Sequence, residues 1–159
     1  MPVDLRDLDV VVSAQLLGRA LERETLARLH ARGHRQARPH HGYVFQHLVD
    51  GPMAIGRIAE RMDVSQQAVS KTVAELERLG YVRRRPGRDD RRVRIVALTA
   101  KGRRVVDDAR EIRAQISAEL AAGLGERRAE RLRGLLADGL VAVGAAPAIR
   151  ERRVPPGEA

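Results

Sequence analysis

The sequence of 159 residues has no cysteine and no tryptophan, and aromatic residues make up only 2% of it. Without cysteine the chain has no disulfide, thiol nucleophile or thiol redox sensor. With so few aromatic residues, a core has to consist of leucine, valine, isoleucine and alanine. No stretch approaches the roughly 18 apolar residues that cross a bilayer, and the first residues lack the pattern of a secretion signal. We therefore expect a soluble cytoplasmic protein with no membrane partner.

Motifs that carry catalysis are missing as well. The sequence contains no phosphate-binding loop, no nucleophile elbow around a serine and no zinc-peptidase helix motif. Asp89 and Asp90 are adjacent on a basic loop, whereas a pair of catalytic carboxylates faces across a cleft. We expect no enzymatic activity, no cofactor and no metal.

Positive charge is concentrated in one segment. The formal net charge is +9, and residues 78–104 hold eleven basic side chains against two acidic ones. The rest of the chain is balanced, with 19 basic and 19 acidic residues. A preference for arginine over lysine has a bland cause in codon usage, but codon usage does not gather the excess in one place. The segment therefore indicates a polyanionic partner.

The apolar spacing predicts a mainly α-helical protein with six helices and one small β-hairpin. The last helix is expected to bury Ala129, Leu132, Leu136 and Leu140, and the tail over 145–159 is expected to be disordered. The predicted elements are helices over 5–30, 39–49, 54–62, 65–79, 99–122 and 126–143, and strands over 81–85 and 92–98.

The two short helices over 54–62 and 65–79 are joined by a tight turn. Ser65 is placed to cap the second helix. Its outward side chains are polar and of modest size, which suits a helix that enters the DNA major groove. An ordinary helix pair with a solvated polar face remains the alternative for this motif alone. The residues expected to contact DNA here are Ser65, Gln66, Gln67, Ser70 and Lys71.

The basic hairpin that follows shifts the balance towards DNA. Arginines at a narrow hairpin tip can enter the minor groove, where negative potential is concentrated. Asp90 is expected to hold the Arg92 side chain at a fixed angle. The alternative is a hairpin whose charge only protects a sheet edge. The hairpin residues expected at DNA are Arg84, Arg88, Asp90, Arg91 and Arg92.

Residues 52–104 resemble the winged helix-turn-helix of the MarR (multiple antibiotic resistance regulator) family of bacterial transcription factors. Met62-Asp63 stands where that family often has leucine-glycine. The motifs that carry the resemblance are Ile58-Ala59-Glu60-Arg61-Met62, Val64-Ser65, Val69-Ser70-Lys71, Leu76-Glu77-Arg78-Leu79-Gly80-Tyr81-Val82, Asp89-Asp90-Arg91-Arg92 and Leu98-Thr99-Ala100-Lys101-Gly102.

The resemblance implies a homodimer whose dimerisation helices lie in 1–31 and 99–144, with the DNA-binding domain at 38–98. It further implies a pseudopalindromic double-stranded DNA operator and, usually, repression of a promoter. Two other functions stay open: a winged-helix protein that only binds other proteins, and an architectural DNA binder indifferent to sequence. Sequence-independent binding depends steeply on salt but shows no preferred operator.

Histidines cluster around the connector between the first two helices. The MarR resemblance implies that small aromatic acids bind in this neighbourhood, and arginines of the connector could attract an anion. We favour a plainer interpretation, in which the histidines are satisfied structural groups. A metal site from His30, His34 or His40 with Glu24 is less favoured still. The candidate residues for a small aromatic or anionic effector are His41, Tyr43, Phe45 and His47.

Overall fold

The structure, a computed structural model, describes residues 3–87, 90 and 92–153. In this part of the chain all six predicted helices and both predicted strands are present, with a short additional strand and an additional helix. The elements are the 3₁₀ turn η1 (Leu5–Asp7), α1 (Val10–Ala31), α2 (Pro39–Leu48), β1 (Met53–Ala54), α3 (Ile55–Met62), α4 (Gln66–Arg78), β2 (Val82–Pro86), β3 (Arg94–Leu98), α5 (Ala100–Leu124), α6 (Glu126–Ala142) and α7 (Ala146–Arg150).

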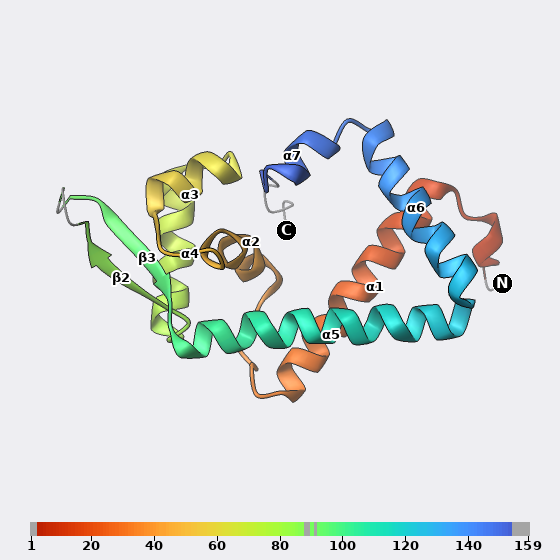
Figure 1. Cartoon of the computed structure of the whole chain (residues 1–159), viewed down its shortest axis with the longest axis horizontal. Coiled ribbons are helices and arrows are strands. Elements are labelled where there is room, and N and C mark those ends of the chain that lie inside the picture. The colour runs from red at the N-terminus through yellow and green to blue at the C-terminus, as the bar shows by residue number, and fades with distance from the viewer. Residues whose placement is uncertain (1–2, 88–89, 91, 154–159) are drawn as a thin grey trace.

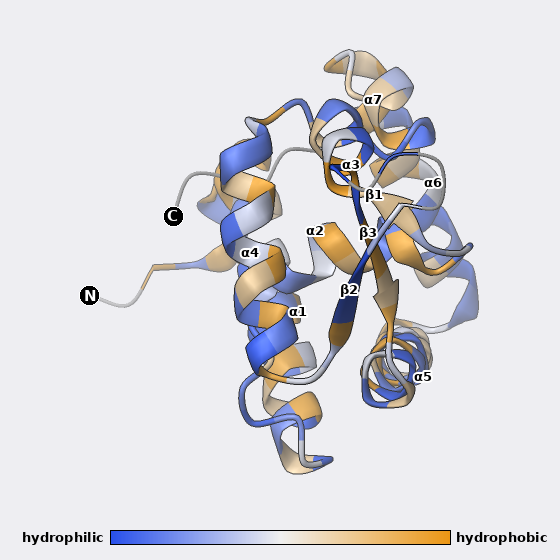
Figure 2. Ribbon diagram, turned by 90° about the vertical axis from the view of Figure 1, so that its left-hand side faces the viewer, coloured by the Kyte–Doolittle hydropathy of each residue, from blue (hydrophilic) through white to orange (hydrophobic). Residues whose placement is uncertain are grey.

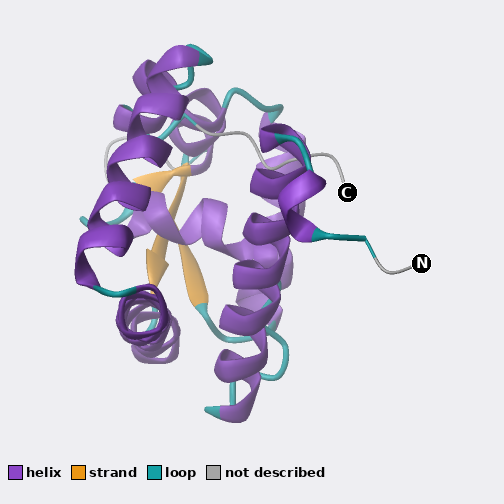
Figure 3. Cartoon of the chain, turned by 90° about the vertical axis from the view of Figure 1, so that its right-hand side faces the viewer, coloured by secondary structure: helices purple, strands orange, loops and turns teal. Residues whose placement is uncertain are grey.

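The long helix α5 connects two unlike ends of the molecule (Figure 1). Helices α3 and α4 and the hairpin of β2 and β3 lie at one end, and α1 and α6 lie towards the other. Figure 3 shows that helices make up most of the structure and the sheet only a small part. No helix in the described ranges has an apolar stretch long enough to cross a membrane.

The sheet has three antiparallel strands in the order β1-β3-β2. Val82 pairs with Leu98 and Pro86 with Arg94, so the hairpin keeps one register along its length. Strand β1 was not predicted, because two residues are too few to show the alternating pattern of a strand. It pairs Met53 with Val96 and so ties the start of α3 to the hairpin.

The apolar core lies where α2, α3, α4 and the sheet meet the start of α5. Its aliphatic side chains come from the helix faces predicted by the three-to-four residue spacing. Tyr81, Phe45 and His41 bring aromatic rings into the same core. The fully buried aliphatic side chains, with at most 1% of their surface exposed, are Val44, Ile58, Val69, Val73, Leu76, Val96 and Ile112.

The junction between β3 and α5 shows why threonine and glycine recur in its motif. The Thr99 side chain accepts a hydrogen bond from the Gly102 backbone amide at 3.0 Å and so caps α5. A Cβ atom on Gly102 would lie only 1.9 Å from the Tyr81 carbonyl oxygen. Only glycine therefore allows α5 to pack this closely against the end of α4.

The terminal helices bury little of their apolar surface. Leu29 is the one buried residue of α1, and α6 has none. The prediction that α6 buries Leu136 and Leu140 is therefore wrong for the isolated chain, in which 47% and 43% of their surface is exposed. Ala129 and Leu132 are half-buried. One small subunit offers too little surface to cover these faces.

Both ends of the chain differ from expectation. Helix α1 begins at Val10 rather than near residue 5, because the Asp9 side chain accepts the Val12 amide at 2.9 Å and caps it. Part of the tail expected to be disordered folds as α7. After α7, Arg152 reaches back to the end of α2, where it donates to the Asp50 carboxylate at 2.6 Å and the Gln46 carbonyl at 3.0 Å.

Candidate nucleic-acid interface

Helix α4 has one buried and one exposed face. Val69, Val73 and Leu76 are buried against the core, which turns the polar positions outward. Ser65 caps the helix as predicted, because its hydroxyl accepts the Ala68 amide at 3.1 Å. Of the residues expected at DNA, Ser65, Gln66, Gln67 and Lys71 are exposed and Ser70 is half-buried.

The turn between α3 and α4 adopts a left-handed backbone at Asp63. Asp63 has φ 52° and ψ 45° and ends α3. Aspartate tolerates this region better than most residues because its short side chain bonds locally. Met62-Asp63 therefore forms the tight turn expected between the two helices, and Met62 is buried.

The hairpin lies beside α4 and carries its charge on strand β2, which Figure 2 shows mainly in the hydrophilic colour. Arg83 and Arg85 are exposed. Arg84 is held by Glu77 of α4, since the carboxylate accepts the Arg84 backbone amide at 2.9 Å and its Nε at 2.6 Å. Hydrogen bonding from Arg84 lowers the pKa of Glu77 below its usual value. This contact fixes the hairpin against the helix.

At the hairpin tip, Asp90 contacts a different part of Arg92 from the one predicted. The Asp90 carboxylate accepts the backbone amide of Arg92 at 2.8 Å, so it orders the loop backbone rather than the Arg92 guanidinium. Arg92 is exposed. Arg88 and Arg91, also expected at DNA, lie outside the described residues.

Two histidines and a glutamate meet where α2 crosses α4. His41 is 1% exposed, and its Nε2 lies 3.5 Å from Glu75, which also lies 3.3 Å from His40 Nε2. Burial, followed by the charge of His40, lowers the pKa of His41 to about 4. Burial of Glu75 alone would raise its pKa, but the hydrogen bond from His40 and the nearby positive charges outweigh it and lower that pKa.

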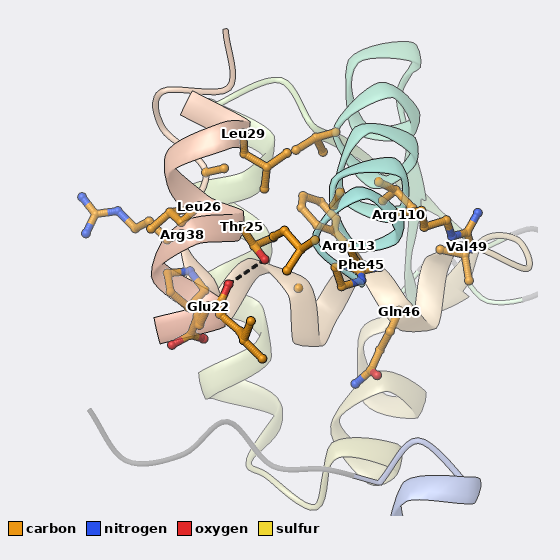
Figure 4. A pocket seen from close by; sticks show the side chains of 18 of the residues that line it. Glu22, Thr25, Leu26, Leu29, Arg38, Phe45, Gln46, Val49, Arg110 and Arg113 are labelled. Carbon is orange, nitrogen blue, oxygen red and sulfur yellow. Dashed lines mark hydrogen bonds between the residues drawn. The ribbon is translucent and has the colours of Figure 1, made fainter. Parts of the chain in front are cut away.

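A cavity of about 640 Å³ lies between α1, α2 and α5. Its walls are mostly apolar, with Leu29, Phe45 and Val105 among them, and several arginines also line it. Figure 4 shows Phe45 and Arg113 near its centre, while Arg38 extends away from it. Loss of water around Arg113, then the charge of Arg110, lowers the pKa of the Arg113 guanidinium.

The cavity does not use the residues predicted for an effector, apart from Phe45. It is lined by Gly42, Gln46 and Val49 on the same face of α2 as Phe45. His41, Tyr43 and His47 point elsewhere on the helix, and none of them lines it. The cavity and the predicted effector site therefore share helix α2 and Phe45, while the opposing walls of the cavity come from α1 and α5, which are distant in sequence.

The less favoured metal ligands are not assembled. His30 Nε2 lies 3.0 Å from the Ala37 carbonyl, and His34 Nε2 lies 2.6 Å from the Asp108 carboxylate. Glu24 instead pairs with Arg28 on its own helix at 2.7 Å. The hydrogen bond from His34 lowers the pKa of Asp108. These histidines hold the connector and α5 together.

The helix pair, the capped outer helix and the hairpin define a winged helix-turn-helix protein. Residues 38–93 match the model of the MarR family. The resemblance to the MarR family that the motifs predicted is thereby confirmed. Among curated proteins, none matches the chain.

Solved structures share the fold over most of the chain. The YusO protein from Bacillus subtilis is 27% identical, with a TM-score of 0.69, covering 84% of this chain and 94% of that one. The transcriptional regulator BldR from Sulfolobus solfataricus is 26% identical, with a TM-score of 0.53, covering 87% and 99%. MepR from S. aureus, in a complex with DNA, shares the fold at 18% identity, with a TM-score of 0.65 over 86% and 99%.

Proposed function

We propose that the protein is a homodimeric regulator of transcription that binds a specific double-stranded DNA operator, represses a promoter and is released by a small molecule. The observation that carries the proposal is the exposed polar face of α4 beside a hairpin rich in exposed arginine. A groove-reading helix needs both parts: polar side chains for base edges and cations for the backbone.

Specificity is assigned to the first two turns of α4. Glutamine can bond the edge of adenine through two hydrogen bonds, and serine can serve several bases. Gln66, Gln67 and Ser70 carry these groups, and Lys71 suits a phosphate or guanine. The amides at the start of α4, beside the Ser65 cap, are placed to face a phosphate. Base contacts of this kind distinguish an operator from random DNA.

Affinity is assigned chiefly to the hairpin. Arg85 and Arg92 are exposed on it, and we include Arg88, Asp90 and Arg91 in the same interface. Arg84 is bonded to Glu77, so we keep it in the interface as the residue that orients the hairpin towards the groove beside α4. Phosphate contacts are insensitive to sequence and weaken steeply with salt.

The dimer is supported by apolar side chains that the isolated chain leaves uncovered. Val10, Val11 and Leu16 of α1 and Leu136 and Leu140 of α6 are exposed. Several large apolar side chains left exposed on two helices support an interface between proteins that covers them. A two-fold dimer of these helices would present two copies of α4 to major grooves about 34–36 Å apart, and hence to a pseudopalindromic operator.

The release step is supported by the cavity between α1, α2 and α5. Its volume of about 640 Å³ falls within the roughly 300–1,000 Å³ of small-molecule sites. Apolar walls suit an aromatic or other apolar body, and Arg110 and Arg113 suit an attached anion. Because the cavity adjoins both a terminal helix and α2, a ligand there would alter the spacing of the two DNA-reading ends.

The test compares Gln67→Ala with Gln36→Ala, a change of another exposed glutamine in the connector. Gln67→Ala should cost about 1–3 kcal/mol of binding free energy on the operator and little on random duplex. Arg92→Ala should weaken both complexes and reduce the salt slope by about one. Fluorescence anisotropy over a salt series measures all three variants. Equal losses on both DNAs for Gln67→Ala would reject base reading in favour of an architectural binder.

A further inference from the structure

The cluster at the crossing of α2 and α4 contains a buried ring nitrogen without a partner. His41 Nε2 has no hydrogen-bond partner although the residue is 1% exposed. It faces the Glu75 carboxylate at 3.5 Å, beyond good hydrogen-bond geometry. A buried polar atom left unsatisfied costs free energy and calls for an explanation.

We propose that His40, His41 and Glu75 form a binding site for one divalent transition-metal ion of the Zn²⁺ class. One ligand atom from each residue lies within 4.8 Å of the other two. Two ligands about 2.1 Å from a tetrahedral ion stand about 3.4 Å apart. The observed separations from Glu75 oxygens are 3.3 Å to His40 Nε2 and 3.5 Å to His41 Nε2. These two distances are to Oε2 and Oε1 of Glu75 respectively, so the three ligand atoms have to draw together around an ion from separations of up to 4.8 Å.

The donor set selects the class of ion. Two imidazoles with one carboxylate suit Zn²⁺, Co²⁺, Ni²⁺ and Cu²⁺, whereas Mg²⁺ and Ca²⁺ prefer oxygen ligands alone. Three protein ligands leave a fourth position for water. The side chain of His40 is 42% exposed, so the ion has a route in from solvent. His41 closes the other side.

Binding requires two local changes. The Arg38 backbone amide donates to His41 Nδ1 at 3.2 Å, so a neutral His41 carries its proton on Nε2. A ligating imidazole carries its proton on the other nitrogen. The proton therefore moves from Nε2 to Nδ1, and the Arg38 amide gives up its bond. The Arg38 side chain, 3.6 Å from Glu75 and 67% exposed, swings out into solvent.

The proposed ion would link α2 to α4. These ligands come together only in the folded chain, because Glu75 is more than thirty residues from both histidines. An ion that binds only the folded state raises the temperature of unfolding by mass action. This effect does not depend on DNA, so the metal site is testable even if the protein binds none.

The experiment titrates ZnCl₂ and CoCl₂ into the full-length, metal-free protein. Calorimetry follows Zn²⁺, and visible absorption of Co²⁺ reports the geometry of the ion. Glu75→Gln removes the carboxylate ligand and His40→Asn one imidazole, both at partly exposed positions. Matched controls are Glu77→Gln on the same helix as Glu75 and His30→Asn in the last turn of α1. Circular dichroism confirms that each metal-free variant is folded.

We expect one ion per chain, the strong visible bands of four-coordinate Co²⁺ and a raised unfolding temperature. Glu75→Gln and His40→Asn should weaken binding by at least about tenfold, since changes even outside the ligand shell cost 10–100-fold. The controls should bind as the parent does. No saturable uptake by the parent, or equal affinity in Glu75→Gln and Glu77→Gln, would overturn the proposal.

Discussion

The DNA-reading end and the terminal helices of this chain treat their apolar side chains in opposite ways. Between Val44 and Leu98 most large aliphatic side chains are buried within the chain. On α6 none is buried, and Leu135, Leu136, Leu140 and Val141 are all exposed. The first region therefore has an apolar core of its own, whereas the second leaves its apolar side chains uncovered in the single chain. Charge follows the same division, since the excess of arginine lies in the region with its own core.

The difference teaches where each kind of sequence signal applies. Periodic apolar spacing marks a face that will be buried, but it does not say whether the covering surface belongs to the same chain. In α4 the partner surface is α2, α3 and the hairpin. In α6 the described residues supply no equivalent, and we infer that a second copy does.

The largest expected effect comes from placing charge on the exposed apolar face of α6. Arginine at both Leu136 and Leu140 would place two charges in the inferred interface, where unpaired charge is costly to bury. We expect the dimer to dissociate and operator binding to fall with it. Sedimentation equilibrium measures the mass, with Arg131→Ala on the same helix as the control. An unchanged dimer would show that α6 is not part of the interface.

A substitution in the core between Val44 and Leu98 should change the stability of the single chain rather than its association. Leu76→Ala removes a side chain with 0% exposure and should lower the free energy of unfolding by about 2–5 kcal/mol. The exposed Lys71→Ala, on the same helix, should change it by less than about 0.5 kcal/mol. Urea unfolding at two protein concentrations checks both values. The comparison would fail if Leu76→Ala shifted the dimer equilibrium more than the unfolding of the chain.

A substitution at Gly102 tests the close packing of α5 against Tyr81, where the two regions meet. Gly102→Ala forces Cβ against the Tyr81 carbonyl and should cost about 1–3 kcal/mol of unfolding free energy, as overpacking does. Gly123→Ala on the same helix meets nothing within 4 Å, and should stabilise by about 0.5–1 kcal/mol. Thermal unfolding of the two variants should therefore shift in opposite directions. Equal shifts would mean that α5 is free to move away from Tyr81.

The smallest expected effect is a loss of folding stability at acidic pH. His41 is kept neutral by burial, and its pKa of about 4 lies below the ordinary 6.5. Between these values the unfolded chain binds the extra proton, so stability should fall as the pH drops from about 6.5 to 4. The slope should reach up to about 1.4 kcal/mol per pH unit for this group. Glu75, whose pKa is also lowered, adds to the loss at the acidic end.

Urea unfolding at a series of pH values measures this slope. His34→Asn is a useful control, because His34 is buried against Asp108 rather than in the His41 cluster. The slope assigned to His41 should persist in that variant. A stability that stayed constant from pH 6.5 to 5 would show that folding does not lower the pKa of His41.

Local chemistry explains why the DNA-reading unit was predictable. Ser65 acts through a neighbour only three residues away, and the sequence identified it as the cap of α4. The buried positions of α3 and α4 followed from a period of three to four residues. The outward positions of Gln66 and Gln67 followed from the same period, because what is not buried on such a helix is exposed.

The remainder depends on contacts between distant residues. Arg84 was predicted to contact DNA, whereas in the folded chain its side chain donates a hydrogen bond to the Glu77 carboxylate. The cavity face of α2 is set by α1 and α5, and the helical pattern of α2 alone does not distinguish that face from the one carrying His41. Helix α7 was missed because a proline-rich, charged tail resembles disorder, whereas Arg152 ties it to Asp50.

The most direct test of the central claim is selection of bound fragments from random duplex DNA at physiological salt, using the full-length protein. Two copies of α4 on a two-fold dimer should recover an inverted repeat with half-site centres about one helical turn apart. Fragments enriched in no common sequence, or in a single unrepeated site, would contradict the account of paired reading helices.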